Sequence, residues 1–405
     1  MAASVPVPPQ PMAPFPDCPV ASRRTGLVWS ERYMWHDTGS WAGSVPSGIA
    51  ATRGTFNQPG VHYENAETKR RLYNLLAACG LLEQLTPVKP RIASVDEVAR
   101  FHDREYIASL KAMSDVAGGD AGECAVFGPG SFEMALLAVG GGLAAVDAVV
   151  AGQLDNAYVL CRPPGHHAER GRGRGFCLFN NVALAAMHAQ QVHGLRRVAI
   201  VDYDVHHGNG TQQAFYEDSS VLVVSVHQDG LYPNHSGALT ENGAGTGEGF
   251  HINVPLPPGT GVGGYAAAFD RVVIPALEAF NPELLLVSSG FDASALDPLS
   301  HMMATSSCFG AMATKLLDAA RRGAAAGRAV FFHEGGYSEV HAPFCGLRVI
   351  EAMAGVMRSN VVDEYDEEFH HYGYQALQPH QDAVIAEAER LVATLSDVCV
   401  PRGNS

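Results

Sequence analysis

Short runs of branched and apolar residues recur along the middle of the chain. They occupy residues 157–161, 198–202, 221–226, 284–287 and 329–332. Runs of this length and composition predict strands that are buried on both faces. The stretches between most of them, such as 181–193, 265–280 and 309–322, are long enough for helices. Because strands alternate with helices, the pattern predicts an α/β fold with a parallel sheet flanked by helices.

The rest of the chain predicts one large domain with an appendage at each end. Residues 1–24 begin with seven prolines in the first twenty positions, which indicates a flexible arm and not a secretory signal. Residues 25–357 form the domain, and residues 358–405 add an acidic segment and a helix that is expected to pack on it. The longest uncharged apolar stretch, 134–146, is too short to span a bilayer and predicts a buried helix.

Composition narrows the classes of function. With 405 residues, 47% of them hydrophobic, the chain can bury a large core, which excludes intrinsic disorder. The 27 basic and 42 acidic residues give a net charge of 27 − 42 = −15, which disfavours binding to nucleic acid or to a membrane. The eight cysteines include no C-x-x-C pair, which is typical of reduced thiols in the cytoplasm.

Polar residues that can bind ligands follow each of the five predicted strands. These segments are 163–167, 202–209, 225–227, 290–292 and 334–337. Parallel strands place their carboxyl ends at one edge of the sheet, where such folds bind ligands. We therefore expect the five segments to form one site.

A metal is the simplest ligand for part of this site. Asp202, Asp204 and His206 are spaced two apart, so on an extended strand they would project from one face. Asp204 and His206 with Asp292 would make three protein ligands and leave a position open, as hydrolytic zinc sites require. The same motif alone would also suit a hydrogen-bonded turn, but the neighbouring His166 and the clustered acids favour a metal site.

The adjacent His166 and His167 are the residues best suited to move a proton, because a neutral imidazole titrates near neutral pH. The rigid Pro-Pro-Gly segment before them would fix their direction. Asp202 could hold one ring and Asn209 the other. The two histidines would then be a proton-transfer pair beside the metal.

Loop residues could complete the site. Tyr337 follows Gly335 and Gly336, which would let its hydroxyl approach a substrate and stabilise an oxyanion. Gly175, Phe176 and Tyr232 could form the walls of a narrow apolar slot or simply pack.

Five motifs together resemble the histone deacetylase family, and within it class II and the bacterial histone deacetylase-like amidohydrolases. They are PPGHH (163–167), GFCLFNN (175–181), DYDVHHGNG (202–210), SGFDA (289–293) and EGGYS (334–338), and the similarity extends from about 26 to 355. The resemblance implies a three-layer arginase-like α/β fold with a mainly parallel sheet. It also implies a zinc-dependent enzyme that hydrolyses the amide of N6-acetyl-lysine to acetate and the free amine.

The resemblance also implies residue roles. The zinc ligands would be Asp204, His206 and Asp292, the general base His167, its electrostatic partner His166, and the carbonyl-polarising phenol Tyr337. The substrate tunnel would be formed by Phe176, Tyr232, Gly175, Leu299 and Gly335. Potassium would bind Asp202, Asp204, His206, Ser225 and Val226, and a second, weaker potassium site would involve Phe215, Asp218 and Val221.

Two positions depart from parts of the family. Asn209 stands where class I members have aspartate, so His167 would lack a negative partner and be the less basic imidazole. Leu299 stands where the polyamine-specific branch has a glutamate, so a cationic polyamine would lose its anchor.

Several alternatives remain at this point. The substrate would be an acylated lysine in a peptide or protein, or a small acylated amine such as an acetylpolyamine. A catalytically silent acyl-lysine binding module and a thiol hydrolase using Cys177 with His166 are the other readings. Two carboxylates and one imidazole accept Fe(II) as well as Zn(II). The resemblance also allows a homo-oligomer, either a dimer or a tetramer.

Overall fold

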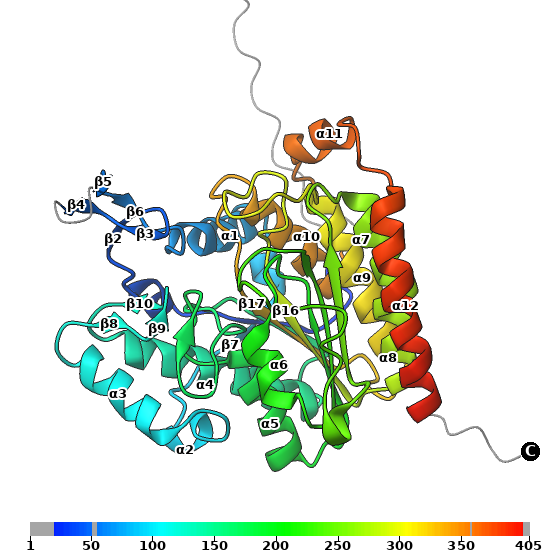
Figure 1. Cartoon of the computed structure of the whole chain (residues 1–405), viewed down its shortest axis with the longest axis horizontal. Coiled ribbons are helices and arrows are strands. Elements are labelled where there is room, and N and C mark those ends of the chain that lie inside the picture. Colours follow the sequence, from blue (N-terminus) through cyan, green and yellow to red (C-terminus); the bar gives the residue numbers. More distant parts are fainter. Residues whose placement is uncertain (1–19, 51–54, 357–358, 400–405) are drawn as a thin grey trace, which may run out of the picture.

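A single eight-stranded sheet forms the centre of the protein (Figure 1), in the order β15-β14-β13-β16-β17-β11-β1-β7. The computed structural model describes residues 20–50, 55–356 and 359–399. The strands are β1 (Thr25–Val28), β7 (Thr86–Val88), β11 (Asn156–Val159), β13 (Val198–Asp202), β14 (Val221–Gln228), β15 (His251–Leu256), β16 (Leu284–Ser289) and β17 (Ala329–His333). Every pairing in this sheet is parallel. The predicted parallel sheet is therefore confirmed.

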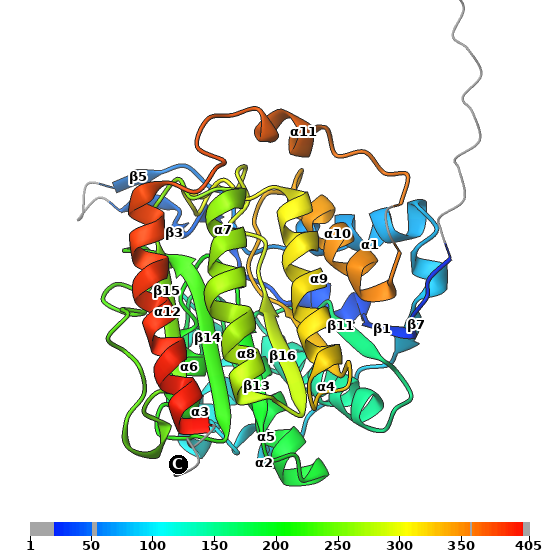
Figure 2. The same cartoon turned by 90° about the vertical axis from the view of Figure 1, so that its right-hand side faces the viewer.

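Helices cover both faces of the sheet. They are α1 (Glu67–Ala78), α2 (Val95–Val98), α3 (Arg104–Ser114), α4 (Ser131–Val150), α5 (Asn181–His193), α6 (Asn209–Phe215), α7 (Val262–Ala268), α8 (Ile274–Phe280), α9 (Ser306–Arg322), α10 (Ala342–Ala354), α11 (Glu364–His370) and α12 (Pro379–Cys399). Figure 2 shows α12, α8 and α9 side by side over one face. Helices α4, α5 and α6 contact the strands on the opposite face. A π-helical turn, Phe269–Val273, joins α7 to α8, so the predicted helix at 265–280 is one rod with a wide turn.

Small β elements and single helical turns carry the loops around the sheet. The β elements are β2 (Ser40–Ala42), β3 (Val45–Pro46), β4 (Gly48–Ala50), β5 (Thr55–Asn57), β6 (Gly60–Val61), β8 (Gly119–Asp120), β9 (Gly122–Glu123), β10 (Val126–Phe127) and β12 (Gly173–Arg174). The 3₁₀ turns are Glu31–Trp35, Leu82–Gln84 and Gly245–Gly247.

Side chains along each strand point alternately to the two faces of the sheet, so the hydrophobic core has two layers, one on each face. In β13, Ala199 and Val201 belong to the hydrophobic cluster under α7 to α10, whereas Val198 and Ile200 belong to the cluster under α4 and α5. All four side chains are fully buried. Burying such side chains stabilises the fold by about 1.5–3 kcal/mol each for valine and isoleucine. The two layers hold the strands rigidly, and with them the loops at the carboxyl ends.

Helix α4 is the buried helix expected around residues 134–146, extended at both ends. It is long and apolar enough to cross a membrane, but most of its apolar segment is buried in the protein. It contacts α5, β11 and β17, so it is a core helix of this fold.

We expect Gly140→Ala in α4 to destabilise the protein. Alanine favours a helix by about 1 kcal/mol over glycine, but a Cβ at this position would overlap the Arg91 carbonyl oxygen. Overpacking of this kind costs about 1–3 kcal/mol. The free energy of unfolding in urea should therefore fall, and an increase would contradict the packing. Ala144→Gly, at a half-buried position of the same helix, is the control and should lose only the propensity difference.

The two ends of the chain are fixed to the domain where the structure describes them. Within the expected arm 1–24, Ser22 N–H donates to the Ala354 carbonyl at 3.0 Å, and Arg24 pairs with Asp155 at 2.6 Å. Residues 1–19 of that arm lie outside the described residues. At the other end, α12 contacts α8 and β15, and the acidic segment forms α11.

Candidate active site

The loop after β13 brings the expected metal ligands together, although not in the expected way. The strand ends at Asp202, and the next residues form an irregular turn, so the extended strand predicted through His206 is wrong. Carboxylates fold this turn by accepting main-chain N–H groups: Asp202 Oδ1 accepts from Asp204 at 3.1 Å, and Asp204 Oδ1 accepts from His206 at 2.9 Å. Main-chain hydrogen bonds to these acids therefore position the ligands.

Asp204, His206 and Asp292 form a buried group. His206 Nδ1 lies 3.1 Å from Asp204 Oδ1 and 3.1 Å from Asp292 Oδ2. Asp292 Oδ1 accepts the Val205 N–H at 2.9 Å, and Asp204 Oδ2 accepts the Gly335 N–H at 2.8 Å. Both carboxylate ligands are thus oriented by a second hydrogen bond, as metal ligands usually are.

The electrostatics of this group call for a cation. Burial and the negative charge of Asp204 raise the pKa of Asp292 to about 6. Burial alone would lower the pKa of His206, but its hydrogen bonds to Asp204 and Asp292 raise it to about 10. Two buried carboxylates so close together are costly without a positive partner. The donor set and its burial therefore fit a divalent metal ion.

Among the described residues, two other groups have ligand atoms close enough to hold a metal. One consists of Asp147, His188 and His193, but His188 Nδ1 accepts a hydrogen bond from Arg100 at 3.0 Å. If His188 bound a metal through Nε2, Nδ1 would carry the proton and face this guanidinium. The other, His166 with Cys177 and Glu334, shares its imidazole with Asp202. The Asp204 group is therefore the best candidate.

The two histidines are paired as predicted. His166 Nδ1 lies 3.0 Å from Asp202 Oδ2, and His167 Nδ1 lies 2.9 Å from Asn209 Oδ1. Burial opposes the charged form of His166, but Asp204 and Asp202 raise its pKa to about 10. Burial and the neighbouring His166 lower the pKa of His167. His167 is thus the less basic imidazole and the better proton acceptor at neutral pH.

Two acids that position this machinery were not predicted. Glu334 Oε2 accepts the N–H groups of Gly165 and His166 at 2.7 and 3.2 Å, which holds the turn before the histidines. Asp297 Oδ2 accepts the Tyr337 N–H at 2.7 Å. Both act on main-chain groups. Glu334 belongs to the 334–337 segment expected at the site, although no role was assigned to it, and Asp297 lies two residues before Leu299.

A narrow pocket of about 230 Å³ leads to the metal group. Its lining comprises Ser44, Cys124, His167, Gly175, Phe176, His206, Leu231, Tyr232, Leu299 and Tyr337. Of these, Ser44, Cys124 and Leu231 were not predicted. Gly335, expected to face the substrate, is not among the lining residues; its N–H donates to Asp204, and a Cβ there would overlap Asp292. Gly175 has φ +50°, and a Cβ there would lie 2.5 Å from the His167 ring.

The aromatic side chains make the pocket a slot. The rings of Phe176 and Tyr337 meet edge to face at 5.7 Å, and those of His167 and Tyr232 at 5.1 Å. Such a slot suits an unbranched alkyl chain.

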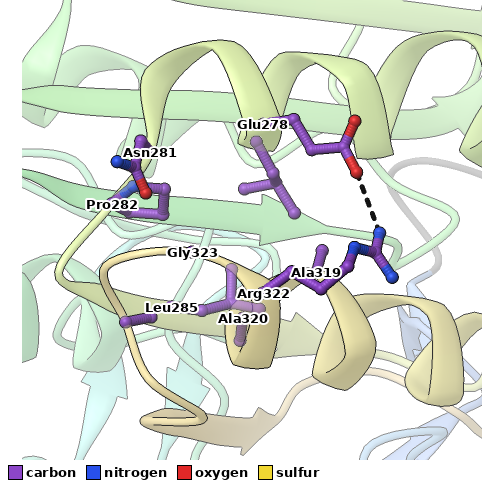
Figure 3. Close-up of a pocket in the computed structure, with 10 residues that line it drawn as sticks. Glu278, Asn281, Pro282, Leu285, Ala319, Ala320, Arg322 and Gly323 are labelled. Atoms are coloured by element: carbon purple, nitrogen blue, oxygen red, sulfur yellow. Dashed lines mark hydrogen bonds and ion pairs between the residues drawn. The ribbon is translucent and has the colours of Figure 1, made fainter.

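Another cavity, of about 350 Å³, lies between the carboxyl-terminal ends of α8 and α9 (Figure 3). Its charged residues, Glu278 and Arg322, pair with each other at 2.8 Å. It lies beside Leu285, near the start of β16, whereas Asp292 follows the end of that strand. This cavity is therefore not part of the metal site.

The residues of the expected potassium sites come from β13, the turn after it, β14, and the end of α6 with the loop that follows it. Asp202 is the register partner of Ser225 on the adjacent strands β13 and β14. The Ser225 hydroxyl is 2.9 Å from His227 Nδ1. For the second site, the Asp218 N–H donates to the Phe215 carbonyl at 2.9 Å. Both potassium sites stay predictions.

Comparison with solved structures supports the fold. The chain is similar to the HDA15 HD domain, with a TM-score of 0.79 and 29% identity, covering 94% of this chain and 97% of that one. The three-layer arrangement is thus the arginase-like fold of histone deacetylase domains.

Comparison with known protein sequences gives relatives of the same kind. The chain is 47% identical over 344 residues to a histone deacetylase-like amidohydrolase from Pseudomonas aeruginosa, covering 84% of this chain and 89% of the relative. It is 36% identical to a probable deacetylase from Archaeoglobus fulgidus, covering 82% of this chain and 86% of the relative. It is 40% identical to the human polyamine deacetylase HDAC10, covering 71% of this chain but only 44% of that protein. Residues 62–353 match the histone deacetylase domain model. The chain therefore belongs to the histone deacetylase family, whose members hydrolyse amide bonds.

Proposed function

We propose that the protein is a zinc-dependent deacylase that removes acetyl groups from N6-acetyl-lysine side chains. The observation that carries this proposal is the buried Asp204–His206–Asp292 group at the pocket that His167 and Tyr337 also line. Asp204, His206 and Asp292 would hold the zinc ion. When bound, zinc would supply Lewis-acid activation of the amide carbonyl and of water.

The chain's own residues would move the proton and stabilise charge. His167 donates Nδ1–H to Asn209, which leaves Nε2 free to take a proton from the attacking water and deliver it to the departing amine. His166, held by Asp202, would stabilise negative charge beside it. The Tyr337 hydroxyl, whose pKa burial raises, stays protonated and can donate to the developing oxyanion.

The pocket favours acyl-lysine over acylpolyamine. A polyamine carries a second cationic group, but none of the described residues that line the pocket has a carboxylate, and Leu299 is among these residues. An acetyl-lysine side chain needs only an apolar slot. Polyamine deacetylation is the second candidate, because the human relative carries that name and is 40% identical over 304 residues.

Turnover of defined substrates tests the proposal. We expect zinc-loaded enzyme to cleave an acetyl-lysine peptide with a kcat/KM at least about tenfold above that for N-acetylputrescine, a difference of about 1.4 kcal/mol in transition-state binding. A chelator should abolish this activity, and zinc or Fe(II) should restore it. A preference for acetylputrescine would support the second candidate, and full activity in metal-free enzyme would contradict the metal mechanism.

The same assay separates two other readings. Burial raises the pKa of the Cys177 thiol, which donates to the Gly175 carbonyl at 3.4 Å, so a reactive thiolate is disfavoured. Alkylation would be ambiguous, because the exposed Cys124 lines the pocket. Cys177→Ser is the clean test and should keep most activity. A silent binding module would bind the peptide without cleaving it.

The remaining parts of the proposal concern the cellular location, a potassium ion and the oligomeric state. The cysteines in the part of the chain that the structure describes are free thiols, which suits a location in the reducing cytoplasm. We also propose that potassium supports the loop after β13, and that the enzyme forms a homo-oligomer.

A further inference from the structure

Glu169 ends a hydrogen-bond chain that begins at the proposed general base. His167 Nδ1 lies 2.9 Å from Asn209 Oδ1, and Asn209 Nδ2 donates to Glu169 Oε1 at 2.9 Å. Asn209 is buried, and only 16% of the Glu169 side chain is exposed. A carboxylate is thus connected to the imidazole through a single amide.

The chemistry of each group fixes the direction of this chain. An ionised carboxylate can only accept hydrogen bonds, so it must face the amide nitrogen of Asn209. The amide oxygen then faces His167 and accepts from Nδ1–H. The neutral ring therefore carries its proton on Nδ1, and Nε2 keeps the lone pair that a base needs. In the flipped amide, oxygen would face carboxylate and the NH₂ group would face Nδ1.

Two arginines keep Glu169 in place and ionised. Arg172 Nε donates to Oε2 at 2.8 Å, and Arg174 Nη1 donates to Oε1 at 3.0 Å. Burial would raise the pKa of Glu169, but hydrogen bonds from Arg172 and Arg174 lower it. The main chain of Glu169 is fixed as well, because its carbonyl lies 2.9 Å from His102 Nδ1.

We propose that Glu169 is a positioning residue for deacylation, which sets the Asn209 amide and thereby the tautomer and orientation of His167. This inference rests on the proposed function. It also revises the expectation that Asn209 leaves His167 without a negative partner, since the carboxylate acts from the far side of the amide. Glu169 lies in the same HHAE segment as the histidines, so a sequence signal was present.

Glu169→Gln tests the inference because it keeps the shape of the side chain but offers a donor as well as an acceptor. The Asn209 amide then loses the acceptor-only partner that requires Nδ2 to face this way, and keeps only the longer contact from Nδ2 to the His167 carbonyl at 3.4 Å. We expect kcat to fall about 10- to 100-fold, as for other groups that orient a catalytic residue. Zinc content should stay unchanged, because Glu169 contacts none of the proposed ligands. KM should change far less than kcat, because Arg174, which lies over the Tyr232 ring, keeps Glu123 as a partner at 3.1 Å. Glu105→Gln, at an exposed site in α3, is the matched control.

A double-mutant cycle gives the sharper test. Asn209→Asp would place a carboxylate next to Glu169, so this variant should lose activity through repulsion. Adding Glu169→Gln to Asn209→Asp should restore activity, because the new amide can donate to the new carboxylate. The sign of the Glu169→Gln effect would thus reverse, which a merely structural role would not produce.

The outcomes separate the inference from the proposed function. If zinc-loaded wild-type enzyme fails to cleave acetyl-lysine peptide, the proposed function is wrong. If wild-type enzyme is active but Glu169→Gln keeps its kcat, or lowers activity in both backgrounds alike, the positioning role is overturned. Thermal unfolding and zinc analysis of each variant identify a loss caused by misfolding. A variant that fails to fold is replaced in the cycle by Glu169→Ala, for which the same reversal is expected.

Discussion

Asp292→Ala is expected to yield protein without stoichiometric zinc and with its deacetylase activity reduced on the order of 10³-fold or more. Asp292 Oδ2 lies 3.1 Å from His206 Nδ1, so its loss removes one of the three proposed ligands. A bound metal contributes several kcal/mol to the transition state, and about 4 kcal/mol corresponds to about 10³-fold. Elemental analysis after gel filtration and kcat/KM for an acetyl-lysine peptide measure the two effects.

Asp292→Asn is the matched variant for this position. Its amide oxygen can still accept the Val205 N–H, which Asp292 Oδ1 accepts at 2.9 Å, so the loop should keep its shape. The amide is neutral and a poor zinc ligand, so metal and activity should still be lost. In metal-free protein this variant should be at least as stable to urea as wild type, because it relieves repulsion from Asp204. Stoichiometric zinc with full turnover in Asp292→Ala would contradict the assigned ligand.

The strands of the sheet could be predicted where a run of apolar residues in the sequence indicates a buried strand. Strands β11, β13, β14, β16 and β17 are central and buried on both faces, so each contains a continuous apolar run. The remaining strands of the sheet give weaker signals. Edge strand β7 is only three residues long and contains Pro87, and β1 contains Gly26. The edge strand β15 alternates polar residues such as His251 with apolar ones.

The site could be predicted where function depends on side-chain type. The structure brings together the three proposed metal ligands and both histidines, which the sequence indicated because few other roles require these residues at strand ends. The local geometry could not be predicted: Asp204 and His206 converge through main-chain hydrogen bonds in a turn, not through strand periodicity. Glu334, Asp297 and Glu169 act on N–H groups or an amide, and although Glu334 and Glu169 lie within or beside the motifs, the motifs do not state these roles.

Tyr337→Phe is expected to lower kcat about 10²- to 10³-fold while leaving KM and zinc content nearly unchanged, because it removes one donor to the oxyanion. Two contacts fix the position of Tyr337: its main-chain N–H donates to Asp297 at 2.7 Å, and its ring packs edge to face against Phe176. Phenylalanine keeps the ring contact, so the wall of the pocket should stay intact. The hydroxyl is therefore the only group removed.

Tyr232→Phe is the control, because it removes a hydroxyl from the other tyrosine of the same pocket. The Arg174 guanidinium lies 5.5 Å from the Tyr232 ring, and this stacking needs only the ring. Tyr232→Phe should therefore lose far less kcat than Tyr337→Phe. Steady-state kinetics on the two zinc-loaded variants measure the kcat that is compared. Equal losses of kcat would show that the effect is not specific to the Tyr337 hydroxyl, and an unchanged kcat in Tyr337→Phe would rule out Tyr337 as the oxyanion donor.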